Sequence, residues 1–418
     1  MIALVDALRL VEETATVLGP RRELLVRSWG RRLAEPVVAD IDSPAWDRAM
    51  MDGFAVANAD FEAVGEGVVE LTVVVDLAAG ATSDMAVGAG TAARIMTGAA
   101  IPPGADAVVP IERAVDGTAA ATAGSRVRLC DPSFRPGQHI ARQGTAFAAG
   151  EEVLTAGSLL TAAEIGLAAE AGATHVVASP QVRVAILSTG SELVGAGAMP
   201  AHGQTRNTNG PMVAAAVSLL GAEPIPLGIA ADRPEAIRAA IRQGLAADVL
   251  LLSGGVSAGD FDLVPGLLQA CGVRQVFHKV QLKPGKPVWF GRLERPGGPP
   301  TLVFGLPGNP ASTLVCFDLF VRPAIGILSG QPPEAWHLPR REAVLTGSCQ
   351  GAAGRPVFLP ARLVEGDGRL TASPQRWTGS SDLRGLAGAS GLIAVPAGAS
   401  FVAGDTLEVL VRTPPVAG

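Results

Sequence analysis

The sequence contains no tyrosine, and aromatic residues make up only 4% of it. Its formal net charge is −6, with 33 basic residues against 39 acidic ones. Nucleic-acid binding proteins rely on basic surfaces and on aromatic side chains that stack against bases. Because both features are scarce, we expect no nucleic-acid partner.

Cysteine is also rare. The four cysteines, Cys130, Cys271, Cys316 and Cys349, lie far apart and form no C-x-x-C pair. This spacing argues against a zinc ribbon and against a disulfide framework. We expect buried thiols, which is the usual environment of a cysteine that is not bonded to another.

Long apolar runs are missing too: none reaches the roughly 20 residues that a membrane-spanning helix needs. The N-terminal segment Met1 to Val11 has Asp6 and Arg9 inside its apolar stretch and no small-residue cleavage site. It therefore indicates the first helix of a folded domain rather than a signal peptide. We expect a cytoplasmic protein with no membrane partner.

Lysine is the most unevenly used residue. Only three of the 33 basic residues are lysines, and Lys279, Lys283 and Lys286 all fall within eight positions. A lysine ammonium is a compact charge on a flexible stem, suited to an oxyanion or a phosphate. A basic surface loop in a chain whose codon usage disfavours lysine is the alternative. We favour an anion-binding site.

A chain of 418 residues is too long for one compact core, so we expect about two to four domains. The fold class that we expect is multidomain, with α/β and β parts. Short apolar runs at 183–188, 249–253 and 302–306 alternate with helical stretches, which is typical of a doubly wound α/β domain. A capping box, Thr161 to Glu164, begins another helix. The expected divisions are an N-terminal helix on the α/β domain (1–28), a linking domain (29–48 and 150–180), an inserted β-rich domain (49–149), the α/β domain (181–329) and a small C-terminal β barrel (330–418).

Polar loops follow the three apolar runs of the α/β domain. They are Thr189 to Glu192, the glycine-rich stretch Ser253 to Asp260, and Gly305 to Pro310. Parallel strands place such loops at one edge of the sheet, where α/β domains bind ligands. Glycines let the backbone approach an anion, although a tight turn alone would also require them. We therefore expect one shared pocket for a phosphate or a pterin.

Carboxylates accompany these loops. Glu192, Asp232, Asp260 and Asp262 are expected around the pocket, and carboxylates beside phosphate-binding loops usually hold Mg²⁺. Helix capping is an equally good explanation for Asp232 and for Asp262 when each is considered alone.

Seven motifs occur in an order that resembles the MoeA family of molybdopterin molybdenumtransferases, which includes the C-terminal domain of gephyrin. They are M-D-G-F-A (51–55), R-I-M-T-G-A (94–99), P-x-G-A-D-A-V-V near 103–110, S-T-G-S-E-L (188–193), S-G-G-V-S-x-G-D (253–260), K-P-G-K-P (283–287) and G-L-P-G-N-P (305–310). The motifs extend over nearly the whole chain, and the set is highly specific.

The resemblance implies an enzyme of molybdenum cofactor biosynthesis. Its substrates would be molybdate and adenylylated molybdopterin, with AMP released and Mg²⁺ present. It also implies a homodimer in which Asp52 and Thr97 reach the partner's active site. Candidate protein partners are molybdopterin synthase, the adenylyltransferase and molybdoenzyme acceptors.

By motif position, the resemblance assigns three sets of residues. The catalytic set is Asp52, Thr97, Glu192, Asp232, Lys279, Lys283 and Lys286. The cofactor-binding set is Thr189, Gly190, Asn207, Asn209, Ser253, Gly254, Gly255, Ser257, Gly259, Asp260, Pro307, Gly308, Asn309, Pro310 and Ser380. The metal-binding set is Asp232, Asp262 and Glu192.

Two positions depart from the family pattern. The family usually has an aspartate where this chain has Ala146, and its D-T-N or D-S-N is here Asn207-Thr208-Asn209. Losing two negative charges would weaken Mg²⁺ binding or reduce repulsion toward molybdate, and the sequence leaves both open. The alternatives are a catalytically weakened scaffold homologue and a molybdopterin adenylyltransferase. The β-rich and C-terminal regions argue against the latter.

Overall fold

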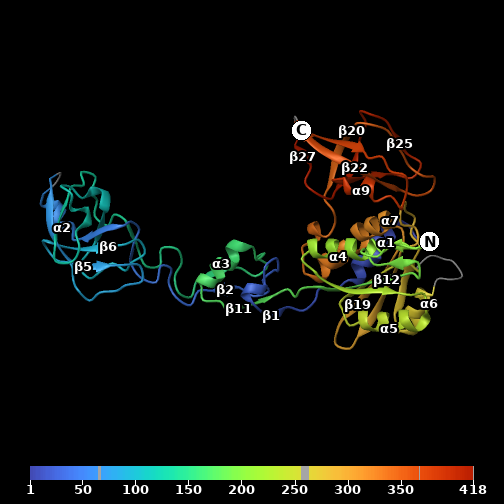
Figure 1. Cartoon of the computed structure of the whole chain (residues 1–418), viewed down its shortest axis with the longest axis horizontal. Helices are drawn as coiled ribbons and strands as arrows, with labels where there is room; N and C mark the ends of the chain where they lie inside the picture. The colour runs from blue at the N-terminus through green and yellow to red at the C-terminus, as the bar shows by residue number, and fades with distance from the viewer. Residues whose placement is uncertain (65–66, 256–262, 367, 418) are drawn as a thin grey trace. The chain divides into compact units, whose positions relative to one another are not determined.

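The computed structural model describes residues 1–64, 67–255, 263–366 and 368–417 (Figure 1). It divides the chain into two compact units. Unit 1 contains Met1–Arg21, Gly30–Arg32 and Ala178–Gly418, and unit 2 contains Arg22–Trp29 and Leu33–Val177. Each unit is described separately below.

The centre of unit 1 is a six-stranded sheet in the order β15-β12-β16-β19-β18-β17. Its parallel strands are β12 (Arg183–Thr189), β15 (Glu223–Ala230), β16 (Val249–Ser253) and β19 (Gly298–Leu306). The three apolar runs form β12, β16 and β19, as predicted. The sequence did not predict that β18 (Trp289–Arg295) and β17 (Arg274–His278) complete the sheet in antiparallel orientation.

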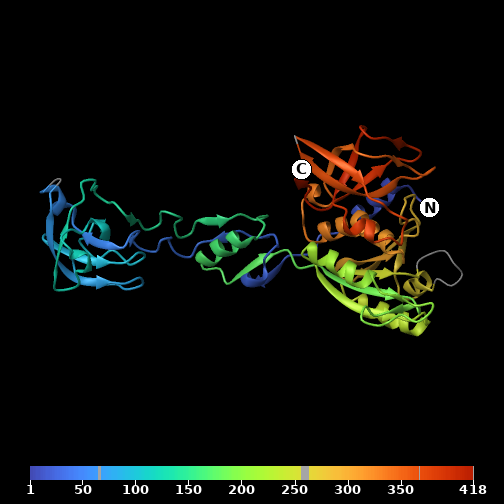
Figure 2. The same ribbon diagram turned by 45° about the horizontal axis from the view of Figure 1, so that its top comes forward.

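Helices cover both faces of this sheet, which confirms the doubly wound fold (Figure 2). Alternate residues of β12 enter two different cores: Ile186 belongs to one and Leu187 to the other. Because both faces are buried, nearly every residue of the central strands is apolar. The helices that contribute to the first core are α1 (Leu4–Thr14), α4 (Asn209–Leu219), α7 (Pro310–Cys316) and α8 (Arg322–Leu328), and those of the second are α5 (Pro234–Gly244) and α6 (Val264–Ala270).

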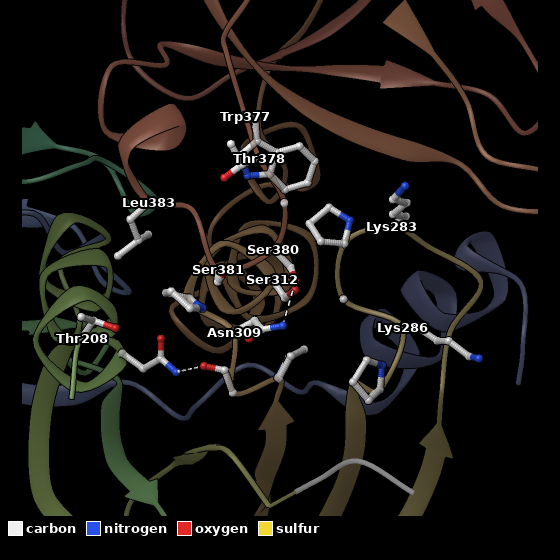
Figure 3. Close-up of a pocket in the computed structure, with 18 of the residues that line it drawn as sticks. Thr208, Lys283, Lys286, Asn309, Ser312, Trp377, Thr378, Ser380, Ser381 and Leu383 are labelled. Atoms are coloured by element: carbon white, nitrogen blue, oxygen red, sulfur yellow. Dashed lines mark hydrogen bonds between the residues drawn. The ribbon is translucent and has the colours of Figure 1, made fainter. Parts of the chain in front are cut away.

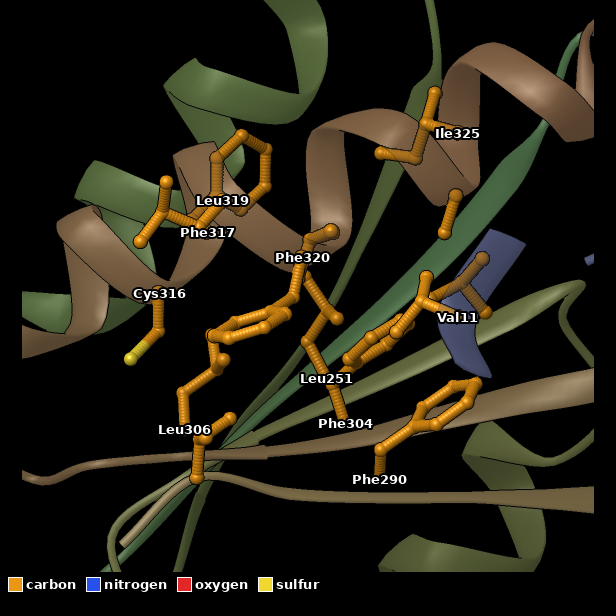
Figure 4. Packing of buried hydrophobic residues seen from close by; sticks show 14 of the residues in the cluster. Val11, Leu251, Phe290, Phe304, Leu306, Cys316, Phe317, Leu319, Phe320 and Ile325 are labelled. Carbon is orange, nitrogen blue, oxygen red and sulfur yellow. The ribbon is translucent and has the colours of Figure 1, made fainter. Parts of the chain in front are cut away.

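The stretch 310–328 contains the π-helical turn Phe317–Val321 between α7 and α8. Its 19 residues are apolar enough to cross a membrane, but 89% of its most apolar window is buried. Figure 4 shows Phe320 of this turn near Leu251 and Phe304 of the sheet, and Phe317 belongs to the same buried cluster. The stretch is thus a core helix of unit 1.

A closed five-stranded barrel near the C-terminus confirms the predicted C-terminal fold. The strands β20 (Arg340–Leu345), β26 (Thr406–Val411), β24 (Gly391–Val395), β22 (Val357–Gly366) and β23 (Arg369–Pro374) pair in this order, and β23 pairs with β20 to close the ring. The shorter elements of unit 1 are β13 (Leu193–Val194), β14 (Thr205–Arg206), β21 (Cys349–Gln350), α9 (Arg384–Ala387), β25 (Ser400–Phe401) and β27 (Val416–Ala417).

Unit 2 contains the β-rich region, whose five-stranded sheet has the order β7-β4-β6-β5-β8. These strands are β4 (Gly53–Val56), β5 (Val69–Leu77), β6 (Thr91–Ile95), β7 (Ala107–Pro110) and β8 (Arg126–Leu129). The helix α2 (Asn58–Glu62) lies between β4 and β5 in the chain. The other strands and the second α-helix lie wholly or mostly in unit 2: β1 (Arg21–Leu24), β2 (Val37–Val38), β3 (Arg48–Ala49), β9 (Ile140–Ala141), β10 (Glu152–Leu154), α3 (Ala162–Glu170) and β11 (His175–Ala178).

Two local predictions can be compared directly with the structure. The capping box at the start of α3 is confirmed, because the Thr161 backbone N–H donates to Glu164 Oε2 at 2.9 Å. The expectation of four buried thiols was only half right: Cys316 and Cys349 are buried, whereas Cys130 and Cys271 are half-buried.

Candidate functional site

The loops after β12, β16 and β19 meet at one edge of the sheet. The Thr189 hydroxyl donates to the Ser253 carbonyl at 3.5 Å, and the Gly254 N–H donates to the Leu306 carbonyl at 3.2 Å. Neighbouring parallel strands bring their carboxyl ends together, which is why segments far apart in sequence converge here. The structure therefore unites the three polar loops that the sequence singled out.

The two described glycines of the middle loop are required by the protein's own packing. Gly254 has φ of +91°, and a Cβ there would lie 2.5 Å from the Thr189 carbonyl oxygen. Gly255 has φ of +63°, and its Cβ would lie 2.8 Å from the Val264 side chain. Turn geometry and close approach thus account for both glycines without a ligand. Ser257, Gly259, Asp260 and Asp262 lie outside the described residues.

A cavity of about 1090 Å³ opens beside this edge, within unit 1 (Figure 3). Its volume is slightly above the range typical of small-molecule sites, roughly 300–1,000 Å³. Ten residues predicted for the site line it: Glu192, Asn207, Asn209, Lys283, Lys286, Pro307, Gly308, Asn309, Pro310 and Ser380. These residues come from loops of the α/β domain and from the barrel.

Other predicted residues of unit 1 do not line the cavity. Thr189 and Ser253 are buried, and the Ser253 hydroxyl donates to that of Ser188 at 3.2 Å. Lys279 is half-buried with φ of +67°, and its N–H donates to the Val288 carbonyl at 2.9 Å. Among the residues that the structure describes, the other predicted ones outside the lining are Gly190, Asp232, Gly254 and Gly255.

The loop that carries Lys283 and Lys286 is fastened to the barrel. The Lys283 N–H donates to the Pro356 carbonyl at 3.0 Å, and the Phe358 N–H donates to the Lys283 carbonyl at 2.8 Å. Both lysines are exposed, and they line the cavity together with Arg206 and Arg355. With Glu192 as the one carboxylate among the described lining residues, the wall favours an anionic ligand.

Asn207, just before α4, and Asn209, its first residue, have distinct contacts. Asn207 Oδ1 accepts hydrogen bonds from the Gly210 N–H at 3.0 Å and from the Ser188 hydroxyl at 3.1 Å. An aspartate could accept the same bonds, so the replacement removes a charge and keeps the acceptor. Asn209 Nδ2 donates to the Gly308 carbonyl at 2.8 Å, which ties α4 to the loop after β19.

The barrel also contributes residues to the cavity. Of these, the sequence predicted only Ser380. Asn309 Nδ2 donates to the Ser380 hydroxyl at 2.8 Å, and the Ala311 N–H donates to the Ser380 carbonyl at 3.0 Å. Further barrel residues on the wall are Gln350, Arg355, Trp377, Thr378 and Ser381. No spacing in the sequence links these residues to the α/β loops, because only the folded chain brings them together.

Two predicted carboxylates flank the loop after β12. Asp232 Oδ2 accepts a hydrogen bond from the Ser191 N–H at 2.9 Å, and the Glu192 carboxylate lies over Gly190, where a Cβ would approach it to 2.5 Å. Both side chains belong to exposed residues. In the part of the chain that the structure describes, no group of three or more His, Cys, Asp and Glu residues has metal-binding geometry.

In unit 2, Asp52 and Thr97 lie together at the ends of their strands. Asp52 Oδ1 accepts hydrogen bonds from both the backbone N–H and the hydroxyl of Thr97, each at 2.7 Å. These bonds lower the pKa of Asp52 below its ordinary value, the backbone bond having the larger effect. The pair thus presents an exposed, ionised carboxylate. Ala146 is also exposed in unit 2.

Family models match almost the whole chain. The MoeA N-terminal region (domain I and II) matches residues 2–172, a probable molybdopterin binding domain matches residues 185–326, and the MoeA C-terminal region (domain IV) matches residues 342–411. The three matches follow one another in sequence, and the middle one contains most of the loops that surround the cavity.

Curated relatives and solved structures agree with these matches. Molybdopterin molybdenumtransferase 2 of Mycobacterium tuberculosis is 36% identical over 405 residues, which is 95% of this chain and 96% of the relative. Molybdopterin molybdenumtransferase of Bacillus subtilis is 35% identical over 91% of this chain and 87% of its own. A crystal structure of the molybdopterin biosynthesis MoeA protein from Pyrococcus horikosii matches 99% of this chain and 100% of its own, with a TM-score of 0.74 and 29% identity.

Proposed function

The chain belongs to the MoeA family of molybdopterin molybdenumtransferases, and on this basis we propose that the cavity of unit 1 binds molybdopterin in its adenylylated form. The protein is a transferase of molybdenum cofactor biosynthesis that inserts molybdenum, with molybdate and molybdopterin as substrates. AMP would be the second product. The observation that carries the proposal is the convergence of the polar strand-end loops and two lysines on one cavity.

The residues of this wall have separate roles in the proposed reaction. The ammonium groups of Lys283 and Lys286 would bind the phosphate or molybdate oxygens and stabilise negative charge that develops during transfer. Asn309 and Ser380, already joined by a hydrogen bond, would position the ligand between the α/β domain and the barrel. Electrostatic stabilisation is favoured here because the backbone of Lys283 and the Asn309–Ser380 pair are held by hydrogen bonds before the substrate arrives.

A Mg²⁺ ion fits the described carboxylates only in part. Glu192 and Asp232 supply oxygen ligands beside the same loop, and Mg²⁺ commonly takes one or two carboxylates together with substrate phosphates. We propose that they hold the ion with Asp262. When bound, Mg²⁺ would neutralise phosphate charge. The assignment rests on the oxygen ligands that these carboxylates offer, because the residues that the structure describes include no group of three or more His, Cys, Asp or Glu that could hold a metal.

A turnover assay tests the proposed function. Purified protein, adenylylated molybdopterin and molybdate should yield AMP and molybdenum-loaded cofactor in equal amounts. A catalytically weakened scaffold would bind the pterin without releasing AMP. An adenylyltransferase would instead consume ATP with unadenylylated molybdopterin, an outcome that would also reject the proposal.

We propose further that the protein is a cytoplasmic homodimer. Asp52 and Thr97 belong to unit 2, whereas the cavity belongs to unit 1, and closed two-fold association is the commonest way to share a site between copies. Molybdopterin synthase, the adenylyltransferase and molybdoenzyme acceptors are candidate partners, since the pterin must be received and passed on.

Mixing two inactive variants tests the shared site. Asp52→Ala removes one contribution and Lys283→Ala the other, so a heterodimer of the two retains one intact site out of two. Complete random exchange places about half of the subunits in heterodimers, and activity should recover to roughly a quarter of the wild-type value. The measurement is AMP release before and after exchange of differently tagged subunits. No recovery despite complete exchange contradicts a site built from two chains.

Replacing Ala146 tests the departure from the family. Ala146 is exposed, and its N–H donates to the Ser43 carbonyl at 2.9 Å, so Ala146→Asp should fold normally. If the chain lacks a metal ligand, the aspartate should tighten Mg²⁺ binding by up to about tenfold, or 1.4 kcal/mol. If the alanine instead suits the oxyanion, the new charge should raise the molybdate requirement, at a cost of about 3 kcal/mol for each negative charge of molybdate at about 6 Å and an effective dielectric near 20.

Rates measured against Mg²⁺ and molybdate separate these two outcomes for Ala146→Asp. Ala148→Asp, an exposed position two residues further along in the chain, is the control for a general charge effect. An Ala146→Asp enzyme with unchanged dependence on both ions would show that position 146 lies outside the chemistry.

A further inference from the structure

Trp377 stands out on the barrel side of the cavity. Among the described lining residues it is the only aromatic side chain, in a sequence that has five tryptophans and no tyrosine. Figure 3 shows Trp377 and Thr378 on the barrel side, Asn309 and Ser312 at the start of α7, and Lys283 on a third side. An aromatic ring and ammonium groups thus border the same space.

The local structure holds the Trp377 side chain in place. It packs against the main core of unit 1 together with Leu383, and Gly385 lies beneath it, where a Cβ would be 3.2 Å from Trp377 Cδ1. The following turn is closed by Asp382, whose Oδ2 accepts hydrogen bonds from the N–H and the hydroxyl of Thr378, each at 3.0 Å. The indole is therefore a preorganised surface, and little conformational entropy is lost when a ligand contacts it.

The orientation of the indole indicates which interaction it offers. Its Nε1 atom is buried and has no hydrogen-bond partner among the described residues. The part of the half-buried ring that remains accessible is therefore carbon. Such a ring does not act as a donor toward phosphate or molybdate oxygens. It presents an apolar π surface, which attracts planar heterocycles by stacking.

We propose that Trp377 is a stacking platform for a planar heterocycle of the substrate and thereby a specificity-determining residue of this site. The proposal rests on the proposed function, in which the cavity binds adenylylated molybdopterin. That substrate carries two planar ring systems, adenine and pterin, and anionic phosphate between them. The phosphate would then bind the lysine ammonium groups while one of the rings stacks against Trp377, so both the charged and the aromatic side of the cavity would contact the substrate.

Binding measurements with three probes test the proposal in the full-length protein. AMP carries the adenine, neopterin monophosphate carries a pterin, and ribose 5-phosphate carries the phosphate without a base. Trp377→Leu should weaken the binding of AMP or of neopterin monophosphate by about 5- to 140-fold, which corresponds to the roughly 1–3 kcal/mol that a stacking contact contributes. Trp377→Phe keeps a ring and should weaken the same probe by less than about threefold. Ribose 5-phosphate should bind both variants and the wild type equally.

Fluorescence adds a readout that needs no loss of affinity. The stacked probe should quench part of the wild-type tryptophan emission, and Trp377→Phe should abolish that part. Trp336→Phe is the matched control, because Trp336 is also half-buried in unit 1 but does not line the cavity. The quenching should persist in this control.

The outcomes distinguish the two ring systems and the two proposals. If Trp377→Leu loses affinity for AMP alone, adenine is the stacked ring, and if it loses affinity for neopterin monophosphate alone, the pterin is. Either result supports the stacking platform. Equal loss for ribose 5-phosphate would mean that Trp377 only shapes the cavity and would overturn the inference. Unchanged affinities in Trp377→Leu would overturn it as well while leaving the proposed function intact. If the wild type bound none of the three probes, the proposed function would fail and the inference with it.

Discussion

Lys283→Ala should lower turnover by about 30- to 900-fold, with a much smaller effect on KM. Lys283 lines the cavity, and its backbone is bonded on both sides to the barrel, so the ammonium is attached to a fixed loop. Removing a group that stabilises charge in the transition state costs roughly 2–4 kcal/mol of barrier, and each 1.36 kcal/mol is a factor of ten in rate. Steady-state rates of AMP release check this expectation.

Lys283→Arg should restore only part of the rate. The guanidinium keeps the positive charge, but it is planar and larger than the ammonium that the loop presents. Arg242→Ala removes an exposed cation of α5 that does not line the cavity, and it should retain the wild-type rate. Full activity of Lys283→Arg would contradict the anion-binding role of the lysines and would favour codon usage as the explanation of their clustering.

Arg412→Leu should destabilise unit 1 by about 3–5 kcal/mol. Asp318 in the π-helical turn is only 4% exposed, and its Oδ2 accepts a hydrogen bond from Arg412 Nε at 2.8 Å. Arg322 lies 3.9 Å away on the other carboxylate oxygen. Removing Arg412 leaves the desolvated Asp318 charge with only the more distant Arg322 to compensate it. Chemical denaturation followed by fluorescence measures the loss, and adding Asp318→Asn should recover part of it because the amide carries no charge.

Arg340→Leu is the matched control. Arg340 and Glu408 form an ion pair of the same length, 2.8 Å, on the barrel surface, where loss of such a pair costs about 1 kcal/mol or less. If Arg412→Leu were no worse than this control, the buried pair would have no special part in stability.

The effect of Arg412→Leu should also depend on pH. Burial raises the pKa of Asp318, and the charges of Arg412 and Arg322 oppose that rise. Without Arg412 the pKa in the folded protein should rise further, so the neutral acid becomes the favoured form. The destabilisation should therefore be smallest at acidic pH, below the ordinary pKa of an aspartate, and should grow as the pH rises through the raised value. A loss independent of pH would indicate lost packing instead.

Local patterns in the sequence identified the elements that a single stretch of chain specifies. Apolar runs predicted β12, β16 and β19 because a strand covered on both faces must be apolar throughout. Thr161 and Glu164 predicted the start of α3 because the box closes within one turn. The family motifs specified the order of the fold classes and the activity. The five-part division of the chain remains a prediction.

Tertiary structure decided which residues far apart in the sequence contact one another and which line the cavity. The sequence grouped Lys279 with Lys283 and Lys286, but only the latter two line the cavity, since the chain turns between them. Asp52 and Thr97 are 45 residues apart, and Asp318 and Arg412 are 94 apart; no periodic pattern encodes either contact. Trp377 reaches the cavity because the barrel closes through pairing of β23 with both β20 and β22. The sequence by itself thus determined the central parallel strands, the capped start of α3, the family and the activity, because each depends on local residue patterns. The wall of the site depended on packing across the whole of unit 1.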